Sequence, residues 1–174
     1  SGIWKTTDGG RTWTRLGGGL PAGRIGRIGI DLYQANPDIL YAIVENANLR
    51  KPTDAEAKRD AARPKPSEFV VGNEVYRTDD GGRTRKTHAD GISIGSKAAY
   101  SFNILRVDPG DPNHVAVISD AMPNSSDGGK TWQGTSWPPK GMFVHAVGDF
   151  PVLCWDHQNP TTLLVSRAGG FYVK

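Results

Sequence analysis

The sequence predicts an all-β fold, and three observations support this prediction. A motif of the form Ser/Thr-x-Asp-x-Gly-x-Thr occurs at positions 6–12, 78–84 and 125–131. Between its copies lie apolar, alternating runs joined by a turn with proline, as in "LRVDPGDPNHVAVIS" at 105–119. The 174 residues also include 22 glycines and 12 prolines, which suits many short strands joined by tight turns.

The repeated motif predicts a hairpin turn between two strands. Its aspartate can accept hydrogen bonds from backbone amides inside the turn, and its second glycine can adopt the positive φ that such hairpins need. Two copies end in a tryptophan that begins the next strand, where it is expected to bury apolar surface, whereas the second copy ends in Arg85. The residues given this structural role are Asp8, Gly10, Trp13, Asp80, Gly82, Asp127, Gly129 and Trp132.

The spacing of the repeats indicates the architecture. The motif recurs after 47 residues between Thr78 and Ser125, and Asp108 and Asp156, each at the end of an apolar run, lie 48 residues apart. A period in the high forties with four short strands per copy is typical of β-propeller blades. We therefore expect a β-propeller segment of four-stranded antiparallel blades, in which the motif joins the third and fourth strands. Asp31 is taken as the equivalent of Asp108.

The chain divides into blades on this pattern. Residues 1–16 are expected to form the last two strands of a first blade, 24–90 a second blade, 100–137 a third, and 150–174 the first three strands of a further blade. From Asp31 to Asp108 the spacing is 77 residues instead of 48, so 29 extra residues are assigned to an insertion at 47–73. About three blades leave two flanks open. The expected partners are further blades of a parent chain, another subunit or a second copy.

The insertion is expected to contain one short surface helix, within "PTDAEAKRDAARP" at 52–64. Thr53 can cap its N-terminus with Glu56 as the reciprocal partner of a capping box, and Pro64 ends it. The segment has no large apolar residue, so the helix is either a solvated insertion or a surface lid.

Composition limits the partners of the protein. The 21 Lys and Arg residues exceed the 18 Asp and Glu residues by only three and are mostly scattered, so no nucleic-acid partner is expected. The apolar runs have the length of strands, so no membrane insertion is expected either. Cys154 is the single cysteine, which excludes an intrachain disulfide, and its apolar surroundings predict a buried side chain. No signal peptide is visible.

The three motifs resemble the Asp-box (BNR) repeats of sialidase-like propellers. The stretches "GIWKTTDGGRTWTRLGGGLPAGRIGRIGIDLYQANPDILYAIVEN", "RVDPGDPNHVAVISD" and "HAVGDFPVLCWDHQNP" are more narrowly similar to bacterial sortilin-like propeller proteins, often labelled BNR-repeat glycosyl hydrolases. This resemblance implies an internal segment of about three blades from a larger secreted or periplasmic protein. The Phe/Tyr-Arg-Ile-Pro signature of sialidases is missing, and "GRIGR" at 23–27 is only superficially similar.

A ligand is expected on the long loops opposite the motif turns, because binding residues gather on loops held by a rigid scaffold. The candidates for binding a glycan or a peptide are Trp137, His145, Asp149, His88 and Arg24. Trp137 could stack on a ligand or pack on the neighbouring blade, and both readings stay open.

No catalytic residue, metal site or cofactor is assigned, because no facing carboxylate pair, convergent ligand set or phosphate loop can be identified. The leading hypothesis is a non-enzymatic module for protein or glycan binding or for scaffolding. The alternative is a segment of a secreted glycoside hydrolase, sialidase-like or xyloglucanase-like.

Overall fold

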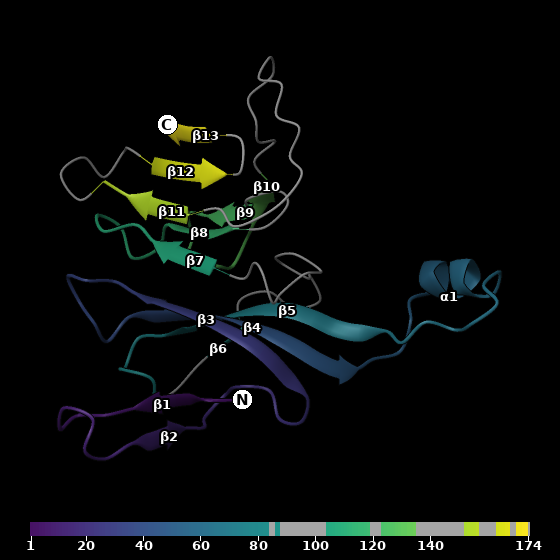
Figure 1. The fold of residues 1–174 in the computed structure, drawn as a ribbon, viewed down its shortest axis with the longest axis horizontal. Coiled ribbons are helices and arrows are strands. Elements are labelled where there is room, and N and C mark those ends of the chain that lie inside the picture. The colour runs from purple at the N-terminus through teal and green to yellow at the C-terminus, as the bar shows by residue number, and fades with distance from the viewer. Residues whose placement is uncertain are drawn as a thin grey trace.

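The described part of the chain consists mostly of strands and contains one helix, which agrees with the predicted all-β class. The computed structural model describes residues 1–83, 86–87, 104–118, 123–134, 152–156, 163–167 and 170–173. These residues contain thirteen strands and one helix, and the strands pair antiparallel throughout (Figure 1). Short strands and tight turns therefore dominate the described part of the chain.

The strands lie in four open sheets, each built from strands that are consecutive in the sequence. The sheets are β1 (Ile3–Lys5) with β2 (Thr14–Leu16); β3 (Ile25–Leu32), β4 (Leu40–Leu49), β5 (Val70–Thr78) and β6 (Lys86–Thr87); β7 (Ile104–Val107), β8 (Val115–Ile118), β9 (Pro123–Ser125) and β10 (Gln133–Gly134); and β11 (Val152–Trp155), β12 (Leu163–Arg167) and β13 (Gly170–Val173). The helix α1 (Asp54–Asp60) lies between β4 and β5 in the sequence.

The sheets follow one another in space in the order of the sequence (Figure 1). The first strands β3, β7 and β11 are each at an edge of their sheet, and they lie in succession, with β7 in contact with both others. Asp31, near the end of β3, links two of these sheets directly. Its Oδ2 accepts a hydrogen bond of 2.9 Å from the backbone N–H of Val107 in β7.

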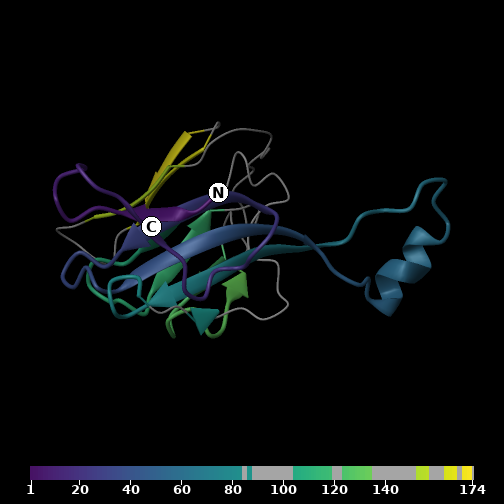
Figure 2. The same cartoon turned by 90° about the horizontal axis from the view of Figure 1, so that it is seen from below.

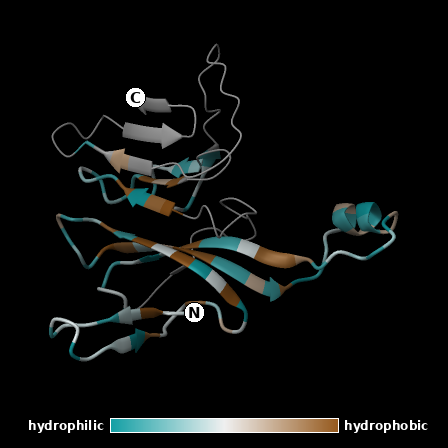
Figure 3. Cartoon of the chain, viewed as in Figure 1, coloured by the Kyte–Doolittle hydropathy of each residue, from teal (hydrophilic) through white to brown (hydrophobic). Residues whose placement is uncertain are grey.

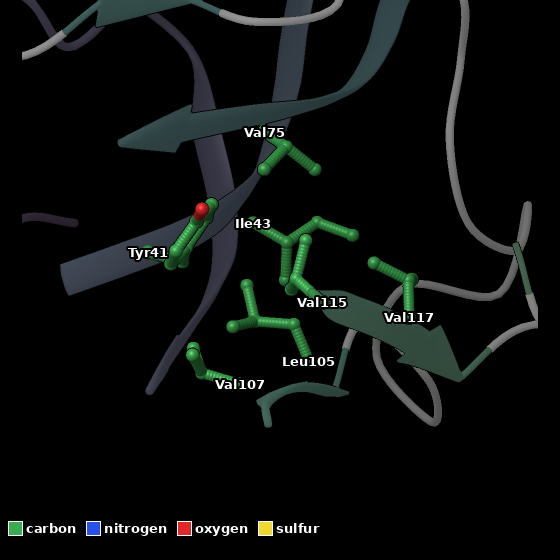
Figure 4. Close-up of a cluster of buried hydrophobic side chains, with 7 residues drawn as sticks. All are labelled: Tyr41, Ile43, Val75, Leu105, Val107, Val115 and Val117. Atoms are coloured by element: carbon green, nitrogen blue, oxygen red, sulfur yellow. The ribbon is translucent and has the colours of Figure 1, made fainter. Parts of the chain in front are cut away.

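The core lies on both faces of the sheet that contains β4. Successive side chains of a strand point to opposite faces, so the buried run at 41–44 serves two interfaces. On one face, a cluster joins this sheet to the β7–β10 sheet (Figure 4) and contains Tyr41, Ile43, Val75, Leu105, Val107, Val115 and Val117. On the other face, Ala42, Val44 and Tyr76 pack against Ile3, Leu20, Ile25 and Ile28. Figure 3 shows these apolar segments in the middle of the stacked sheets, with hydrophilic turns at their ends.

The turns after β3 and β7 show that the expected equivalence of Asp31 and Asp108 is wrong by two residues. Backbone hydrogen bonds from Tyr33 to Ile39 (3.0 Å) and from Asp108 to His114 (2.9 Å) close matching turns. Asp108 therefore corresponds to Tyr33, and Asp31 lies two positions earlier, inside the strand. A shift of two residues preserves the alternation of apolar side chains, so the sequence pattern did not reveal it.

The strands extend further into the predicted insertion at 47–73 than its limits suggest. Strands β4 and β5 still pair at Leu49 and Val70, so only residues 50–69 lie outside the sheet. We call residues 46–73 the arm; Figure 2 shows it projecting from the stacked sheets with α1 near its tip. The predicted capping box is confirmed, because the Thr53 hydroxyl accepts from the Glu56 N–H and the Glu56 carboxylate accepts from the Thr53 N–H.

The prediction that Cys154 is buried is wrong. Its side chain is exposed beside a cavity of about 130 Å³ that is also lined by Asp31, Gln34, Arg106 and Pro109. Cys154 lies in β11, an edge strand of its sheet. In the described ranges, α1 is too short and too polar to cross a bilayer, and no other helix is present.

Candidate functional site

Four of the five binding residues predicted from the sequence, namely Trp137, His145, Asp149 and His88, lie outside the described residues. The fifth, Arg24, is exposed at the start of β3. Its Nη1 lies 3.9 Å from Oε2 of Glu68 in the arm, and both side chains are largely solvated. The Arg24 N–H also donates to Oδ1 of Asn48 (2.9 Å). Arg24 therefore connects the body of the protein to the arm.

The arm forms a groove of about 560 Å³ between α1 and the outer ends of β4 and β5. We call it the arm groove. Its size falls within the range of roughly 300–1,000 Å³ that is usual for small-ligand sites. The side chains that line it include Glu45, Asn46, Arg50, Glu56, Arg59, Asp60, Arg63, Ser67, Glu68 and Phe69. Charged groups of both signs thus alternate with an aromatic ring and the apolar residues of β5.

One wall of the arm groove is held by a bidentate ion pair. Arg50 donates from Nη1 and Nη2 to the two carboxylate oxygens of Glu56, at 2.8 Å and 2.7 Å. The Arg50 guanidinium also lies over the ring of Phe69, 5.8 Å from its centroid. The hydrogen bonds from Arg50, followed by that from the Thr53 N–H, lower the pKa of Glu56 to about 2. This fork of paired hydrogen bonds fixes the orientation of both charged groups.

A second set of hydrogen bonds connects α1 to the segment that follows it in the arm. The Ser67 hydroxyl donates to Oδ1 of Asp60 (2.6 Å), and the Ser67 N–H donates to the same carboxylate. Arg63 donates to the Ser67 hydroxyl oxygen (2.7 Å). The hydrogen bond from the Ser67 hydroxyl, followed by that from the Ser67 N–H, lowers the pKa of Asp60, and the charge of Arg63 lowers it further. The return segment of the arm is thereby tied to the last turn of α1.

The root of the arm is anchored by buried polar side chains. Asn46 is 6 % exposed, and its amide donates to Oε2 of Glu74 (2.8 Å), which also accepts from the hydroxyl of Tyr76 (2.7 Å). Oδ1 of Asn46 accepts from the N–H and the side-chain amide of Asn48. Since buried polar groups are costly to leave unpaired, this network fixes the direction in which the arm leaves the sheet.

This arrangement favours binding over acid–base chemistry. The carboxylates of Glu56 and Asp60 accept several hydrogen bonds, and both have a lowered pKa, so they remain ionised near neutral pH. A general acid needs the opposite shift. Their fixed oxygens and the guanidinium groups beside them can instead form directed hydrogen bonds to a ligand.

The repeated Ser/Thr-x-Asp-x-Gly-x-Thr motif, whose three copies we call the boxes, forms turns in which the aspartate accepts hydrogen bonds from its own copy. Asp8 accepts from the N–H (2.9 Å) and hydroxyl (2.6 Å) of Thr12 and from the Thr6 hydroxyl (2.8 Å), and the Thr6 hydroxyl oxygen in turn accepts from the Gly10 N–H (2.9 Å). In the third copy, Asp127, Thr131, Ser125 and Gly129 form the equivalent bonds.

In the second copy, Thr78 bridges Asp80 and Gly82 in the same way. Both glycines of every box have positive φ, between 69° and 92°. The aspartate and the hydroxyl residue thus act as a pair inside each turn.

The indole of each box tryptophan bonds back to the turn, but the two side chains differ in burial. Nε1 of Trp132 donates to the carbonyl of Gly129 (2.8 Å), and its ring packs against the cluster between the two large sheets. Nε1 of Trp13 donates to the carbonyl of Gly10 (3.1 Å), yet the side chain is 57 % exposed. The expectation that Trp13 buries a large apolar area is therefore wrong, because no described sheet lies against it.

Basic side chains directly before the boxes join neighbouring sheets, and the sequence analysis missed this role. Nζ of Lys5 donates to the carbonyl of Gly81 in the next sheet (3.1 Å). Nη1 of Arg77 donates to Oδ1 of Asn113 (2.8 Å) and to the hydroxyl of Tyr41 (2.9 Å). The Tyr41 hydroxyl donates onward to the carbonyl of Pro112 (2.7 Å), and burial raises its pKa. The signal was a Lys or Arg immediately before two of the three motifs.

Comparisons with known proteins give the following result. No family model matches the chain. No curated protein matches it. Among solved structures, the chain is similar to the crystal structure of the GH74 xyloglucanase from Xanthomonas campestris, at 19 % sequence identity and a TM-score of 0.44. The match covers 74 % of this chain and 17 % of that enzyme, so the chain spans a small part of its length.

Proposed function

We propose that the chain is a non-enzymatic module of an Asp-box β-propeller that binds a glycan or a peptide in the arm groove. It would belong to a larger secreted or periplasmic protein or complex, in which the stacked sheets serve as a scaffold. The observation that carries the proposal is the arm groove itself, a cavity of about 560 Å³ whose charged walls are held in place by their own hydrogen bonds. Such preorganisation lowers the entropic cost of binding.

The sheet arrangement supports the propeller part of the proposal. Two sheets of four antiparallel strands run in chain order from an edge strand, and the edge strands lie side by side. Each Asp box turns the chain from the third to the fourth strand of these sheets. Radial repetition of four-stranded sheets is how a propeller is built.

Binding in the arm groove can be tested with two neighbouring residues of α1. Arg59 lines the groove, whereas Lys58 beside it does not. A panel of oligosaccharides and short peptides would be titrated into the protein by calorimetry or NMR. We expect at least one member of the panel to bind, Arg59→Ser to weaken that binding about tenfold, and Lys58→Ser to leave it unchanged.

The same protein would be incubated with chromogenic glycosides and xyloglucan oligomers. Turnover that follows the purified protein would contradict the non-enzymatic assignment and favour the glycoside hydrolase. Equal losses of affinity in Arg59→Ser and Lys58→Ser would contradict the proposal that the ligand binds in the arm groove. So would the absence of binding by every ligand of the panel.

A further inference from the structure

The three arginines that line the arm groove differ in how their charge is used. Arg50 forms the bidentate pair with Glu56, at 2.8 Å and 2.7 Å. Nε of Arg63 lies 4.0 Å from Oδ1 of Asp60. Among the residues that the structure describes, Arg59 has no partner in an ion pair or a side-chain hydrogen bond. The guanidinium of Arg59 is therefore not committed to another group of the described chain.

The acidic side chains that line the groove, in contrast, already have partners. Glu56 and Asp60 accept hydrogen bonds from the arm itself. Oε2 of Glu45 accepts from a backbone N–H of β3 (3.0 Å), and Oε2 of Glu68 lies 3.9 Å from Nη1 of Arg24. The groove thus pairs each of its described carboxylates and leaves one guanidinium unpaired, so a ligand that complements it carries a negative group.

The distribution of charge along the chain agrees with a negative ligand. Residues 50–69, the part of the arm outside the sheet, contain six of the 21 Lys and Arg residues and four of the 18 Asp and Glu residues. This segment therefore has a net charge of +2, whereas the remaining 15 basic and 14 acidic residues leave the rest of the chain at +1. An excess of positive charge around a groove raises the local concentration of anions.

The paired carboxylates indicate which kind of anion suits the groove. Glu56 and Asp60 have a lowered pKa and stay ionised near neutral pH, so they can accept further hydrogen bonds but repel added carboxylates. A uronic acid has one carboxylate on each sugar ring together with hydroxyl donors, so it can satisfy Arg59 and these acceptors at once. A peptide rich in Asp and Glu would bring several carboxylates against the acidic side chains of the groove. The lining therefore favours an acidic glycan over an acidic peptide.

We propose that the ligand of the arm groove is an acidic glycan, and that the carboxylate of one of its uronate units pairs with Arg59. The planar guanidinium presents a fork of N–H donors that matches the two oxygens of a carboxylate. Hydroxyls of the same sugar donate to the fixed carboxylates of Glu56 and Asp60. The proposal rests on the proposed function, ligand binding in the arm groove, and names the chemical class of that ligand.

Calorimetric titration with an oligogalacturonate and with its methyl ester tests the proposal, because the two differ only in the charge of the carboxyl group. We expect the acid to bind about tenfold more tightly than the ester. Arg59→Gln should remove most of this difference and leave binding of the ester within about twofold, which also shows that the variant is folded. Lys58→Gln is the matched control, since it removes the same charge from the neighbouring residue outside the groove lining.

The remaining outcomes separate this proposal from the proposed function. Equal binding of the acid and the ester would overturn the carboxylate proposal and leave the arm groove as a ligand site. An equal effect of Lys58→Gln would also overturn it, because the attraction would then be general and not directed by Arg59. Hexaglutamate is the third ligand, and tighter Arg59-dependent binding of this peptide than of the oligogalacturonate would overturn the choice of a glycan. Failure of both sugars to bind would overturn it as well, even if another ligand of the panel bound in the groove.

Discussion

The first and third boxes have nearly identical hydrogen bonds in very different surroundings. Asp8 and Asp127 both accept from the N–H and hydroxyl of a threonine four residues later, at distances that agree within 0.1 Å for the closest bonds. Around them, however, Trp13 is 57 % exposed while Trp132 lies against a buried cluster. The hydrogen bonds of the aspartate therefore lie within its own turn, whereas the burial of the tryptophan depends on a neighbouring sheet.

The largest expected difference between the two boxes concerns their tryptophans. Trp132→Ala should lower the free energy of unfolding by about 2–4 kcal/mol, because it removes a ring that packs against the core. Trp13→Ala should change it by less than about 1 kcal/mol, as for an exposed residue. Chemical denaturation at low protein concentration measures both values. Equal losses would show that the rings stabilise the turns themselves and not the contact between sheets.

The second largest difference in the free energy of unfolding is expected for the basic residues directly before the boxes. Arg77→Met keeps the aliphatic part of the side chain but removes its bonds to Tyr41 and Asn113, so we expect a loss of about 1–3 kcal/mol. Lys5→Met removes one bond to the Gly81 carbonyl and should cost about 0.5–1.5 kcal/mol. Urea unfolding of the two variants tests this order. A larger loss for Lys5→Met would contradict the inter-sheet role assigned to Arg77.

A pair of glycine substitutions separates backbone strain from crowding. Gly9 and Gly128 have φ of 72° and 77°, so alanine at either position should cost about 1–2 kcal/mol in strain alone. Gly128→Ala should cost more, because its Cβ would also displace the Arg77 guanidinium, whereas nothing described lies near Gly9. Thermal unfolding of Gly128→Ala in the Arg77→Met background is the control. If the difference between the two glycines persists there, the crowding explanation is wrong.

The smallest expected difference concerns titration of the two aspartates. Bonds from the hydroxyl and the N–H of Thr12 lower the pKa of Asp8 to about 2, and the corresponding bonds from Thr131 lower the pKa of Asp127. A lowered carboxyl pKa contributes stability that is present above the unfolded-state value near 4 and is lost as the pH falls toward the folded-state value. Carboxyl carbon NMR should therefore show both groups still ionised at pH 4. Titration of Asp8 near pH 4 would contradict the turn geometry.

Local features of this fold were predictable from the sequence. The Ser/Thr-x-Asp-x-Gly-x-Thr pattern contains the hydroxyl and carboxylate groups that bond inside each turn, and Thr53 with Glu56 contains both halves of the capping box of α1. These interactions span at most four residues, so residue identity alone determines them. The alternating apolar runs likewise predicted the strands, because the side-chain period of a strand is independent of its partners.

Features that depend on distant segments were not predictable. The exposure of Cys154 and Trp13 depends on which distant elements lie beside them, and neither sequence neighbourhood contains that information. The lining of the arm groove includes Arg50, Glu56, Asp60 and Ser67, all of them ordinary polar residues in a polar stretch. The pairing of Leu49 with Val70 brings the two ends of the segment that carries these side chains together.

The two-sided strand β4 has a consequence for how the protein opens. Tyr41 and Ile43 belong to one core cluster, and Ala42 and Val44 belong to another. Strand β4 therefore cannot separate from the sheet on one side without also exposing the cluster on its other side. The two interfaces should therefore be lost in a single cooperative step, and the amides of β4 and β5 should exchange with solvent deuterium only through it. The β1–β2 hairpin, attached through one face, would open and exchange long before them.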